Sequence, residues 1–459
     1  MINIGKSKEV ILVNVTRKCV AVQLPIWLAV LANALKKNGI EPRVIDLVPV
    51  DPEKRDDHFR AGLSGSGSIV GFSVLAGNDH INQVEHFARL AKAIDPGNVI
   101  VYGGALPTSD PELILNNCVC DYIVCGEGEA RFPELINYIN GGSEKAGMPL
   151  DCYARNKNGV VGERGYRILA GKKSGGLYKL SDLSQPDYSV LHMEFYINYL
   201  RETGQSFEIM ASRGCKGNCS FCSKIVKGLG LRDVDSVLDE ISYVRTRYDY
   251  NKYYFVDENF LDIKSNFKDF VRRKTERKMD FSYIGQCRVD AIDPDICGWG
   301  RDSGLRVISI GIESVNQQTL NKVNKNIDVN IMEEKIGLLR KYGIDVAVNF
   351  IIGFPEDTEN DLKEMISFIR RNGLENKGKV SYLTPLPGTR LWRDCINAGV
   401  VKDQWKFVSS LGNLFYEKEI NLTNLPDDVL EYYFCVMNDL LKKPIGVPVS
   451  PQYLNILKG

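Results

Sequence analysis

The chain has 459 residues, which is enough for about three domains and more than one hydrophobic core. Its 58 lysines and arginines balance 58 aspartates and glutamates, so no overall charge attracts nucleic acid or an anionic membrane, and we expect neither as a partner. The 12 cysteines form no evenly spaced disulfide framework, which favours a reducing cytoplasm.

Up to about residue 140, short β-branched runs alternate with segments of helical length. This alternation predicts an α/β domain, residues 1–140, with a parallel sheet covered on both faces, as in flavodoxin-like and Rossmann-like doubly wound folds. The expected strands are Val10–Val15, Arg43–Leu47, Ser68–Val74, Val99–Tyr102 and Tyr122–Val124. The expected helices lie at about residues 24–38, 80–94, 110–116 and 129–139.

An apolar run from Cys19 to Leu35 follows Arg17-Lys18 and superficially imitates a signal peptide. Polar residues and a proline interrupt it, and it is too short to span a bilayer. We expect a buried helix there instead.

Ligands of doubly wound folds bind beyond the carboxyl ends of the strands, so the residues that follow the predicted strands are candidates. Ser73-x-Leu75 closes the third strand, and Gly103-Gly104 follows the fourth. Paired glycines let a bulky ligand approach the backbone, and a serine can donate a hydrogen bond without blocking it. These elements resemble those of cobalamin-binding domains, and Gly126-Glu127 resembles the end of that domain.

One element of many cobalamin proteins is absent. The D-x-H-x-x-G motif, which supplies a histidine to cobalt, is replaced after the first strand by Asn14 to Arg17. Asp79-His80 has a different spacing, and we interpret it as a helix start. The alternative for the whole domain is a flavodoxin-like unit used only for packing.

Three further cysteines, Cys118, Cys120 and Cys125, lie late in this domain. Two of them would point to opposite sides of an extended segment, so ordinary buried thiols are expected. Residues 141–204 then form a predicted connector. It contains a hairpin-like stretch at 156–168 and a run rich in glycine, lysine and serine at 171–176.

Cys215, Cys219 and Cys222 follow the connector in a C-x3-C-x2-C pattern. Three thiolates on a short loop can hold three irons of a 4Fe-4S cluster and leave the fourth iron open. Structural zinc normally takes four ligands, and no fourth candidate lies nearby. We therefore predict an iron–sulfur cluster rather than a zinc loop or three unrelated thiols.

The loop, with the aromatic Phe221 before its last cysteine, resembles the signature of the radical S-adenosylmethionine (SAM) enzymes. Further segments resemble successive motifs of that family, in its order. They are Asp257-Glu258-Asn259, Gly311-Ile312-Glu313-Ser314, the run from Asn349 to Glu356, and the run from Thr384 to Thr389.

Residues 205–395 contain six apolar runs separated by helix-length segments, which predicts a (β/α)6 partial TIM barrel. The expected strands are Phe207–Ala211, Tyr253–Val256, Phe281–Gln286, Val307–Ile310, Val346–Ile352 and Val380–Leu383. Residues 396–459, with a helix expected at 426–442, would form a small, mainly helical region that caps the barrel and shapes the substrate pocket.

The resemblance implies roles for these residues. The three cysteines would hold the cluster, and Asp257-Glu258 would meet the SAM amino group. The other expected SAM contacts are Phe221, Glu313, Ser314, Ile351 and Gly353. The expected cobalamin contacts are Ser73, Leu75, Gly103, Gly104, Gly126 and Glu127.

The activity implied by the resemblance is that of a cobalamin-dependent radical SAM enzyme, most simply a methyltransferase. A 5'-deoxyadenosyl radical would activate an inert carbon of a small molecule or peptide, and methylcobalamin would donate the methyl group. An electron donor such as flavodoxin or ferredoxin would be the partner. The alternatives are a cobalamin-dependent cyclase or rearrangement enzyme, a cobalamin-free radical SAM enzyme, and a non-catalytic iron–sulfur or cobalamin sensor.

Overall fold

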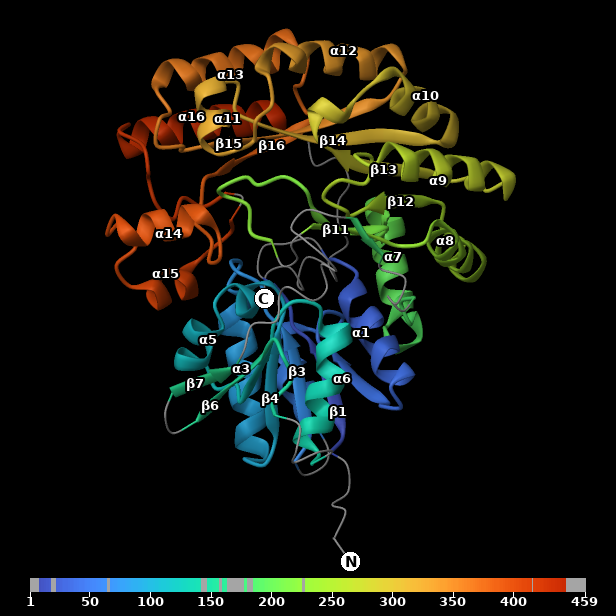
Figure 1. Ribbon diagram of the computed structural model, residues 1–459, viewed down its shortest axis with the longest axis vertical. Coiled ribbons are helices and arrows are strands. Elements are labelled where there is room, and N and C mark those ends of the chain that lie inside the picture. The colour runs from blue at the N-terminus through green and yellow to red at the C-terminus, as the bar shows by residue number, and fades with distance from the viewer. Residues whose placement is uncertain are drawn as a thin grey trace, which may run out of the picture.

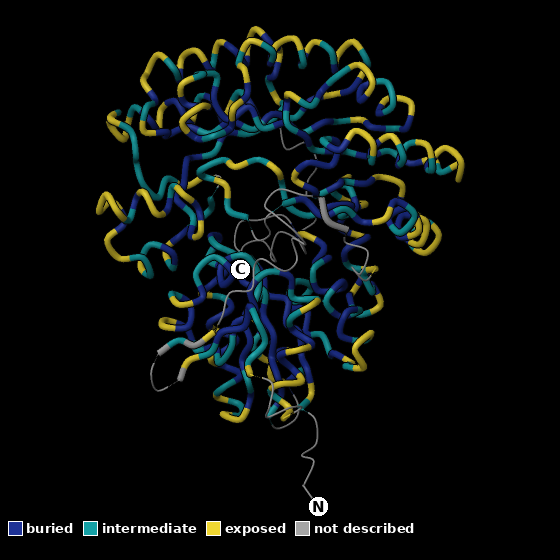
Figure 2. The backbone as a smooth tube through the Cα atoms, viewed as in Figure 1, coloured by how far each residue is buried: buried dark blue, intermediate teal, exposed yellow. Residues whose placement is uncertain are grey.

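The computed structural model describes residues 8–17, 22–63, 67–141, 147–156, 159–162, 177–179, 185–224, 228–414 and 416–442. These residues form two α/β units, one around an N-terminal sheet and one around a C-terminal sheet (Figure 1). The strands of both units are largely buried, whereas the helices expose their outer faces (Figure 2).

The N-terminal sheet has the strand order β2-β1-β3-β4-β5-β6-β7. Its strands are β1 (Val10–Asn14), β2 (Pro42–Asp46), β3 (Ile69–Ser73), β4 (Val99–Gly103), β5 (Tyr122–Val124), β6 (Cys152–Asn156) and β7 (Gly159–Gly162). The first five pair in parallel and confirm the predicted doubly wound fold. The sequence marks them clearly because strands buried on both faces are continuous apolar runs.

Helices pack on both faces of this sheet, in two separate apolar clusters. They are α1 (Ile26–Lys37), α2 (Arg55–Gly62), α3 (His80–Ile94), α4 (Ala105–Ser109), α5 (Pro111–Asn117) and α6 (Gly128–Ile139), with a 3-10 turn η1 (Pro52–Lys54). Helix α1 is the buried helix expected in the apolar run, of which residues 19–21 lie outside the described chain. Helix α2 was not predicted, because it buries only Arg55 and Phe59 and shows no apolar periodicity.

The connector adds strands to the N-terminal sheet. Strand β6 pairs antiparallel with β5 and with β7. Residues 163–168 of the expected hairpin and the run 171–176 lie outside the described chain. The domain bounds at 140 and 204 stay predictions, and these two strands extend the first sheet past 140.

The C-terminal sheet has the order β16-β15-β14-β13-β12-β9, with every pairing parallel. Its strands are β9 (Phe207–Ile209), β12 (Lys252–Phe255), β13 (Ser282–Cys287), β14 (Leu305–Glu313), β15 (Asp345–Ile352) and β16 (Gly378–Tyr382). The six predicted barrel strands are confirmed. Strands such as β13 and β15 alternate buried residues with half-buried ones, which is the pattern of an open barrel with helices on one face.

The helices of this unit lie mostly over the outer face of its sheet (Figure 1). They are α7 (Met193–Thr203), α8 (Val234–Tyr248), α9 (Lys264–Glu276), α10 (Pro294–Ser303), α11 (Gln317–Lys322), α12 (Met332–Lys341) and α13 (Glu359–Arg371), with 3-10 turns η2 (Tyr188–Val190), η3 (Val289–Ala291) and η4 (Val329–Ile331). No helix in the described part of the chain is long and apolar enough to cross a membrane.

The last helices serve both units. Helix α16 (Asp427–Leu441), expected from the sequence, packs on β16 and α13. Helices α14 (Arg390–Asn397) and α15 (Gln404–Ser410) instead contribute Trp392, Cys395 and Val408 to an apolar cluster of the N-terminal unit. The C-terminal region thereby joins the two units.

Candidate functional site

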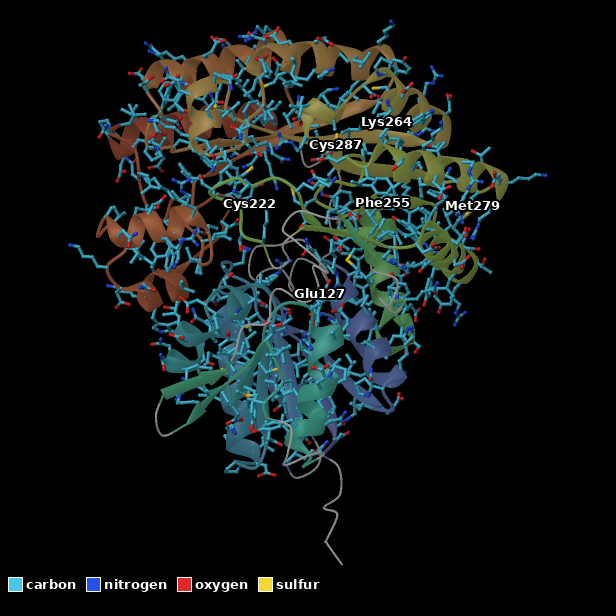
Figure 3. The ribbon with its side chains drawn as sticks, viewed as in Figure 1. Glu127, Cys222, Phe255, Lys264, Met279 and Cys287 are labelled. Atoms are coloured by element: carbon cyan, nitrogen blue, oxygen red, sulfur yellow. The ribbon has the colours of Figure 1, made fainter. Side chains whose placement is uncertain are left out.

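A cavity of about 790 Å³ lies where the carboxyl ends of the N-terminal strands face the mouth of the barrel. All the residues predicted to contact cobalamin line it, namely Ser73, Leu75, Gly103, Gly104, Gly126 and Glu127. Barrel residues line the same cavity from the other side, including Glu208, Met210, Val256 and Glu258. In Figure 3, Glu127 of the N-terminal unit and Cys222 of the barrel unit both lie toward the middle of the molecule.

At the end of β4, Gly104 leaves no room for a side chain. Gly104 has φ +93, and a Cβ atom there would lie 2.7 Å from Ser73 Oγ and 2.9 Å from the Val74 backbone. Ser73 and Gly103 are partners in the ladder between β3 and β4, so the two motifs meet at one point of the sheet edge. This close backbone approach requires glycine at position 104.

His80 lies behind this edge and begins α3, which confirms its interpretation as a helix start. Its Nδ1 accepts a hydrogen bond from the Leu75 backbone N–H at 3.0 Å. Burial, together with the nearby Arg17 charge, lowers its pKa to about 4. The neutral imidazole therefore holds the Ser73-x-Leu75 loop in place.

The features of the cavity fit a large flat ligand such as cobalamin. Glycines form its N-terminal edge, and apolar side chains such as Leu12, Leu24 and Phe132 line its walls. A flat macrocycle needs this combination of close backbone approach and apolar surface.

The cysteine loop begins at the end of β10 (Ser212–Cys215), which pairs with β11 (Gly228–Leu231) and through it with β8 (Leu177–Lys179). Its thiols are not in disulfides; Cys215 and Cys219 are partly exposed and Cys222 is exposed. Within the described residues, no three Cys, His, Asp or Glu side chains converge on a single metal-ion position. A 4Fe-4S cluster does not require such convergence, because each cysteine binds a different iron.

Small residues and cations surround the thiols. A Cβ atom on Gly217 would lie 3.3 Å from Cys215 Sγ and 4.0 Å from Cys219 Sγ, so a side chain there would crowd the Cys215 thiol. Burial raises the pKa of Cys219, and the positive charges of Lys325 and Arg288 oppose that rise. Such cations favour the thiolates that bind iron.

The remaining cysteines behave as predicted. Cys118, Cys120 and Cys125 are buried, and burial raises the pKa of Cys118 and of Cys120 far from the physiological range. They are structural thiols.

Asp257 and Glu258, predicted together as SAM contacts, point to different places. Glu258 is exposed and lines the cavity. Asp257 is buried, and its Oδ2 accepts a hydrogen bond from the Ala211 N–H at 3.1 Å. The Asp257 side chain therefore braces the turn before the cysteine loop through Oδ2, and its predicted contact with SAM stays a prediction.

The predicted contacts on β14 and just after it are also engaged within the protein. Glu313 has φ +61 at a bulge between β14 and β15, and its carboxylate pairs with Lys325 Nζ at 2.8 Å. Ser314 is buried, and its hydroxyl accepts a hydrogen bond from the Asn316 N–H at 3.1 Å. Their SAM contacts stay predictions, and a non-glycine residue with positive φ at this strand end suits a functional site.

The other predicted SAM contacts are Phe221, which belongs to the cysteine loop, and Ile351 and Gly353, which lie at the end of β15. Phe221 packs against Phe354 with 6.1 Å between ring centroids, in a small apolar cluster that Ile351 joins. Gly353 has φ +96, and its N–H donates to Asp357 Oδ2 at 2.8 Å. Phe354, which follows β15, thus contacts the loop through Phe221.

Four charged residues of the site, Arg17, Glu208, Arg213 and Lys325, were not predicted. Glu208 lines the cavity, and burial raises its pKa to about 7 against the opposing charge of Arg17. Lys325 pairs with Glu313, and Arg213 pairs across the cavity with the N-terminal unit. Glu208 did carry a signal, since it is the only charge in the predicted strand Phe207–Ala211, and Arg213 lies two residues before Cys215.

Two family models match the chain in these regions. Residues 209–369 match the Radical SAM superfamily, and residues 14–136 match the B12 binding domain. The chain is a radical SAM protein with an N-terminal B12-binding domain. The two matches confirm the cofactors predicted from the sequence, which are a 4Fe-4S cluster with SAM and a cobalamin.

Curated relatives of this radical SAM protein include methyltransferases and cyclases. It is 30% identical over 315 residues to an uncharacterized methyltransferase of Pyrococcus horikoshii, covering 67% of this chain and 65% of the relative. It is 28% identical over 383 residues to the anaerobic magnesium-protoporphyrin IX monomethyl ester cyclase of Rubrivivax gelatinosus, covering 81% and 66%. The chain thus spans about two thirds of the length of these relatives.

The fold is similar to that of the radical SAM methyltransferase TsrM from Kitasatospora setae, solved with cobalamin and a 4Fe-4S cluster bound. The TM-score is 0.70 at 20% identity, and the match covers 86% of this chain and 75% of that chain. The agreement confirms the arrangement of a B12-binding fold beside a radical SAM partial barrel.

Proposed function

We propose that this protein is a cobalamin-dependent radical SAM methyltransferase acting on an unactivated carbon of a small molecule or peptide. The observation that carries the proposal is the shared cavity. Its N-terminal edge holds Gly103 and Gly104, and its barrel side holds Glu258. A group bound at the glycine edge and a group bound at the barrel mouth would therefore share one cavity.

Different residues of the site would have different roles in the reaction. Cys215, Cys219 and Cys222 would hold the cluster, and Glu258 would receive the SAM ammonium group. The bound cofactors supply radical chemistry and a transferable methyl group. The apolar walls exclude water from the reacting carbon, which prevents loss of reactive species to solvent.

Names of relatives support the methyltransferase proposal over other reactions. The Pyrococcus relative and TsrM are both named as methyltransferases. TsrM has also been solved with tryptophan as substrate and a SAM analogue, which supports a small-molecule substrate. We further propose a reducing cytoplasm, with a flavodoxin or ferredoxin as electron donor, because the cluster requires free thiolates and an external electron.

The proposal is tested with protein purified anaerobically from cobalamin-fed cells and incubated with reductant and SAM labelled in its methyl group. The expected products are 5'-deoxyadenosine, S-adenosylhomocysteine and labelled methylcobalamin. Cys219→Ala should lose the cluster and 5'-deoxyadenosine, whereas the matched control Cys435→Ala, which removes an exposed cysteine of α16, should keep both. Cobalamin-loaded wild type that forms neither S-adenosylhomocysteine nor methylcobalamin would refute methyl transfer.

A cyclase is the second candidate, because the Rubrivivax relative matches 81% of this chain. A cyclase would release 5'-deoxyadenosine without consuming SAM as a methyl donor. The absence of S-adenosylhomocysteine alongside formation of 5'-deoxyadenosine would therefore favour it.

A further inference from the structure

Arg213 connects the two units immediately before the cluster loop. It lies on β10, two residues ahead of Cys215, and its side chain crosses to the N-terminal unit. Its Nη2 lies 2.5 Å from Glu129 Oε1, and its Nη1 lies 3.5 Å from Glu127 Oε1. One guanidinium thus bridges the barrel to the predicted cobalamin turn at Gly126-Glu127.

The contact is enclosed. The side chains of Arg213, Glu127 and Glu129 are only 18%, 8% and 16% exposed. Glu129 lies in the first turn of α6, where the helix dipole favours an acid, and Arg213 lowers its pKa against the rise that burial would cause. Removing one partner of such a pair leaves a charge that is costly to bury.

The same residues border the cavity. Arg213, Gly214, Glu127 and Glu129 all line it, as does Gly126. The Gly126 N–H donates to Thr108 Oγ1 at 2.9 Å, which fixes the turn that carries the acids. A change in this turn would therefore alter the contacts of Arg213, and a change in the cysteine loop would alter the contacts of the turn.

We propose that Arg213 is a positioning residue that couples occupancy of the cobalamin cavity to order in the cluster loop. The inference rests on the proposed function, because it requires both groups to bind. Coupling between two binding equilibria is reciprocal, so the cluster should raise cobalamin affinity by the same factor as cobalamin stabilises the cluster-bound loop.

The test is a titration of the full-length protein with hydroxocobalamin, followed by corrin absorbance, with the cluster reconstituted and with the cluster removed by a chelator. Wild type should bind about fivefold more tightly with the cluster present, which is within the usual range of coupling. In Arg213→Met the ratio of the two affinities should fall to about one, and Arg213→Lys should restore part of it. Arg272→Met, which removes a cation from an exposed ion pair on α9, is the matched control and should keep the wild-type ratio.

A spectroscopic readout separates positioning from general stability. Hydroxocobalamin should change the electron paramagnetic resonance spectrum of the reduced cluster in wild type and leave it unchanged in Arg213→Met. If circular dichroism shows that Arg213→Met does not fold, Glu129→Gln breaks the same contact from the other side and should give the same loss.

The outcomes are distinct. An affinity ratio that stays at the wild-type value in Arg213→Met and Glu129→Gln overturns the inference and leaves the proposed function intact. A wild type that binds hydroxocobalamin equally well with and without the cluster also overturns it. A wild type that binds no hydroxocobalamin in either state refutes the proposed function itself.

Discussion

Replacing Asp257 with asparagine should stabilise the protein at alkaline pH. Burial raises the pKa of Asp257 to about 7, although the Ser212 hydroxyl and the Ala211 N–H favour its charged form. An aspartate in the unfolded chain has a pKa of about 3.9, so the folded state retains a proton that the unfolded state releases between these values. The difference of about 3 units corresponds to at most about 4 kcal/mol, at about 1.36 kcal/mol per unit.

Because the pKa of Asp257 is higher in the folded state than in the unfolded state, the protein loses stability as pH rises. Below about pH 4, Asp257 is protonated in both the folded and the unfolded state, so it has no effect on the pH dependence of stability. As pH rises from about 4 to about 7, the folded state loses stability relative to the unfolded state. Above about pH 7 this loss is complete. An asparagine carbonyl can still accept from the Ala211 N–H and does not ionise. The variant should therefore match wild type near pH 4 and exceed it by up to about 4 kcal/mol at pH 8.

The assay is urea unfolding of the cluster-free protein at pH 5 and pH 8, followed by circular dichroism. The contributions of the other acids that titrate in this pH range cancel when the free energy of unfolding of the variant is compared with that of wild type. Asp302→Asn, which changes an exposed acid of α10, is the matched control for the substitution. Identical pH dependence in wild type and Asp257→Asn would refute the buried-acid argument, and loss of SAM binding in Asp257→Asn would make that side chain a ligand.

Three other changes have defined outcomes. Gly104→Ala should weaken hydroxocobalamin binding at least about tenfold in an absorbance titration, because the added methyl group meets Ser73 and Val74 and the φ of Gly104 is positive. Gly337→Ala, whose Cβ would meet nothing within 4 Å, is the control and should not weaken binding. Arg232→Met should lower the free energy of unfolding by about 3–5 kcal/mol in urea, because it leaves a buried carboxylate without its cation; a loss below about 1 kcal/mol would contradict this. Reconstitution of the cluster should protect Cys222 from alkylation while Cys435 remains reactive, as measured by mass spectrometry; equal labelling of Cys222 with and without the cluster would argue against its role as a ligand.

Most elements of the fold were predictable because each carries a local signal. Continuous apolar runs marked β1 to β5, and the barrel strands were marked in the same way. Helix α2 lacked the apolar periodicity that makes a helix visible in a sequence. The pairing of β6 with β5 depends on contacts between segments about thirty residues apart, which no local pattern reports.

The candidate site was predictable to the level of motifs. The cysteine spacing and the Gly103-Gly104 pair are local features, so the amino-acid sequence shows them directly. The sequence does not show that the side chains of Asp257 and Glu258 point in different directions. The orientation of adjacent side chains at the end of a strand depends on the segments that pack around them.

The amino-acid sequence alone determined the two α/β units, the cysteine loop and the glycine edge, because hydrophobic periodicity and ligand spacing are properties of short segments. Only the tertiary structure decided that these parts share one cavity. It also decided that Arg213 reaches Glu127 and Glu129 across more than eighty residues of chain. Such a contact depends on how two separately built sheets face each other, and that arrangement follows from packing over the whole molecule.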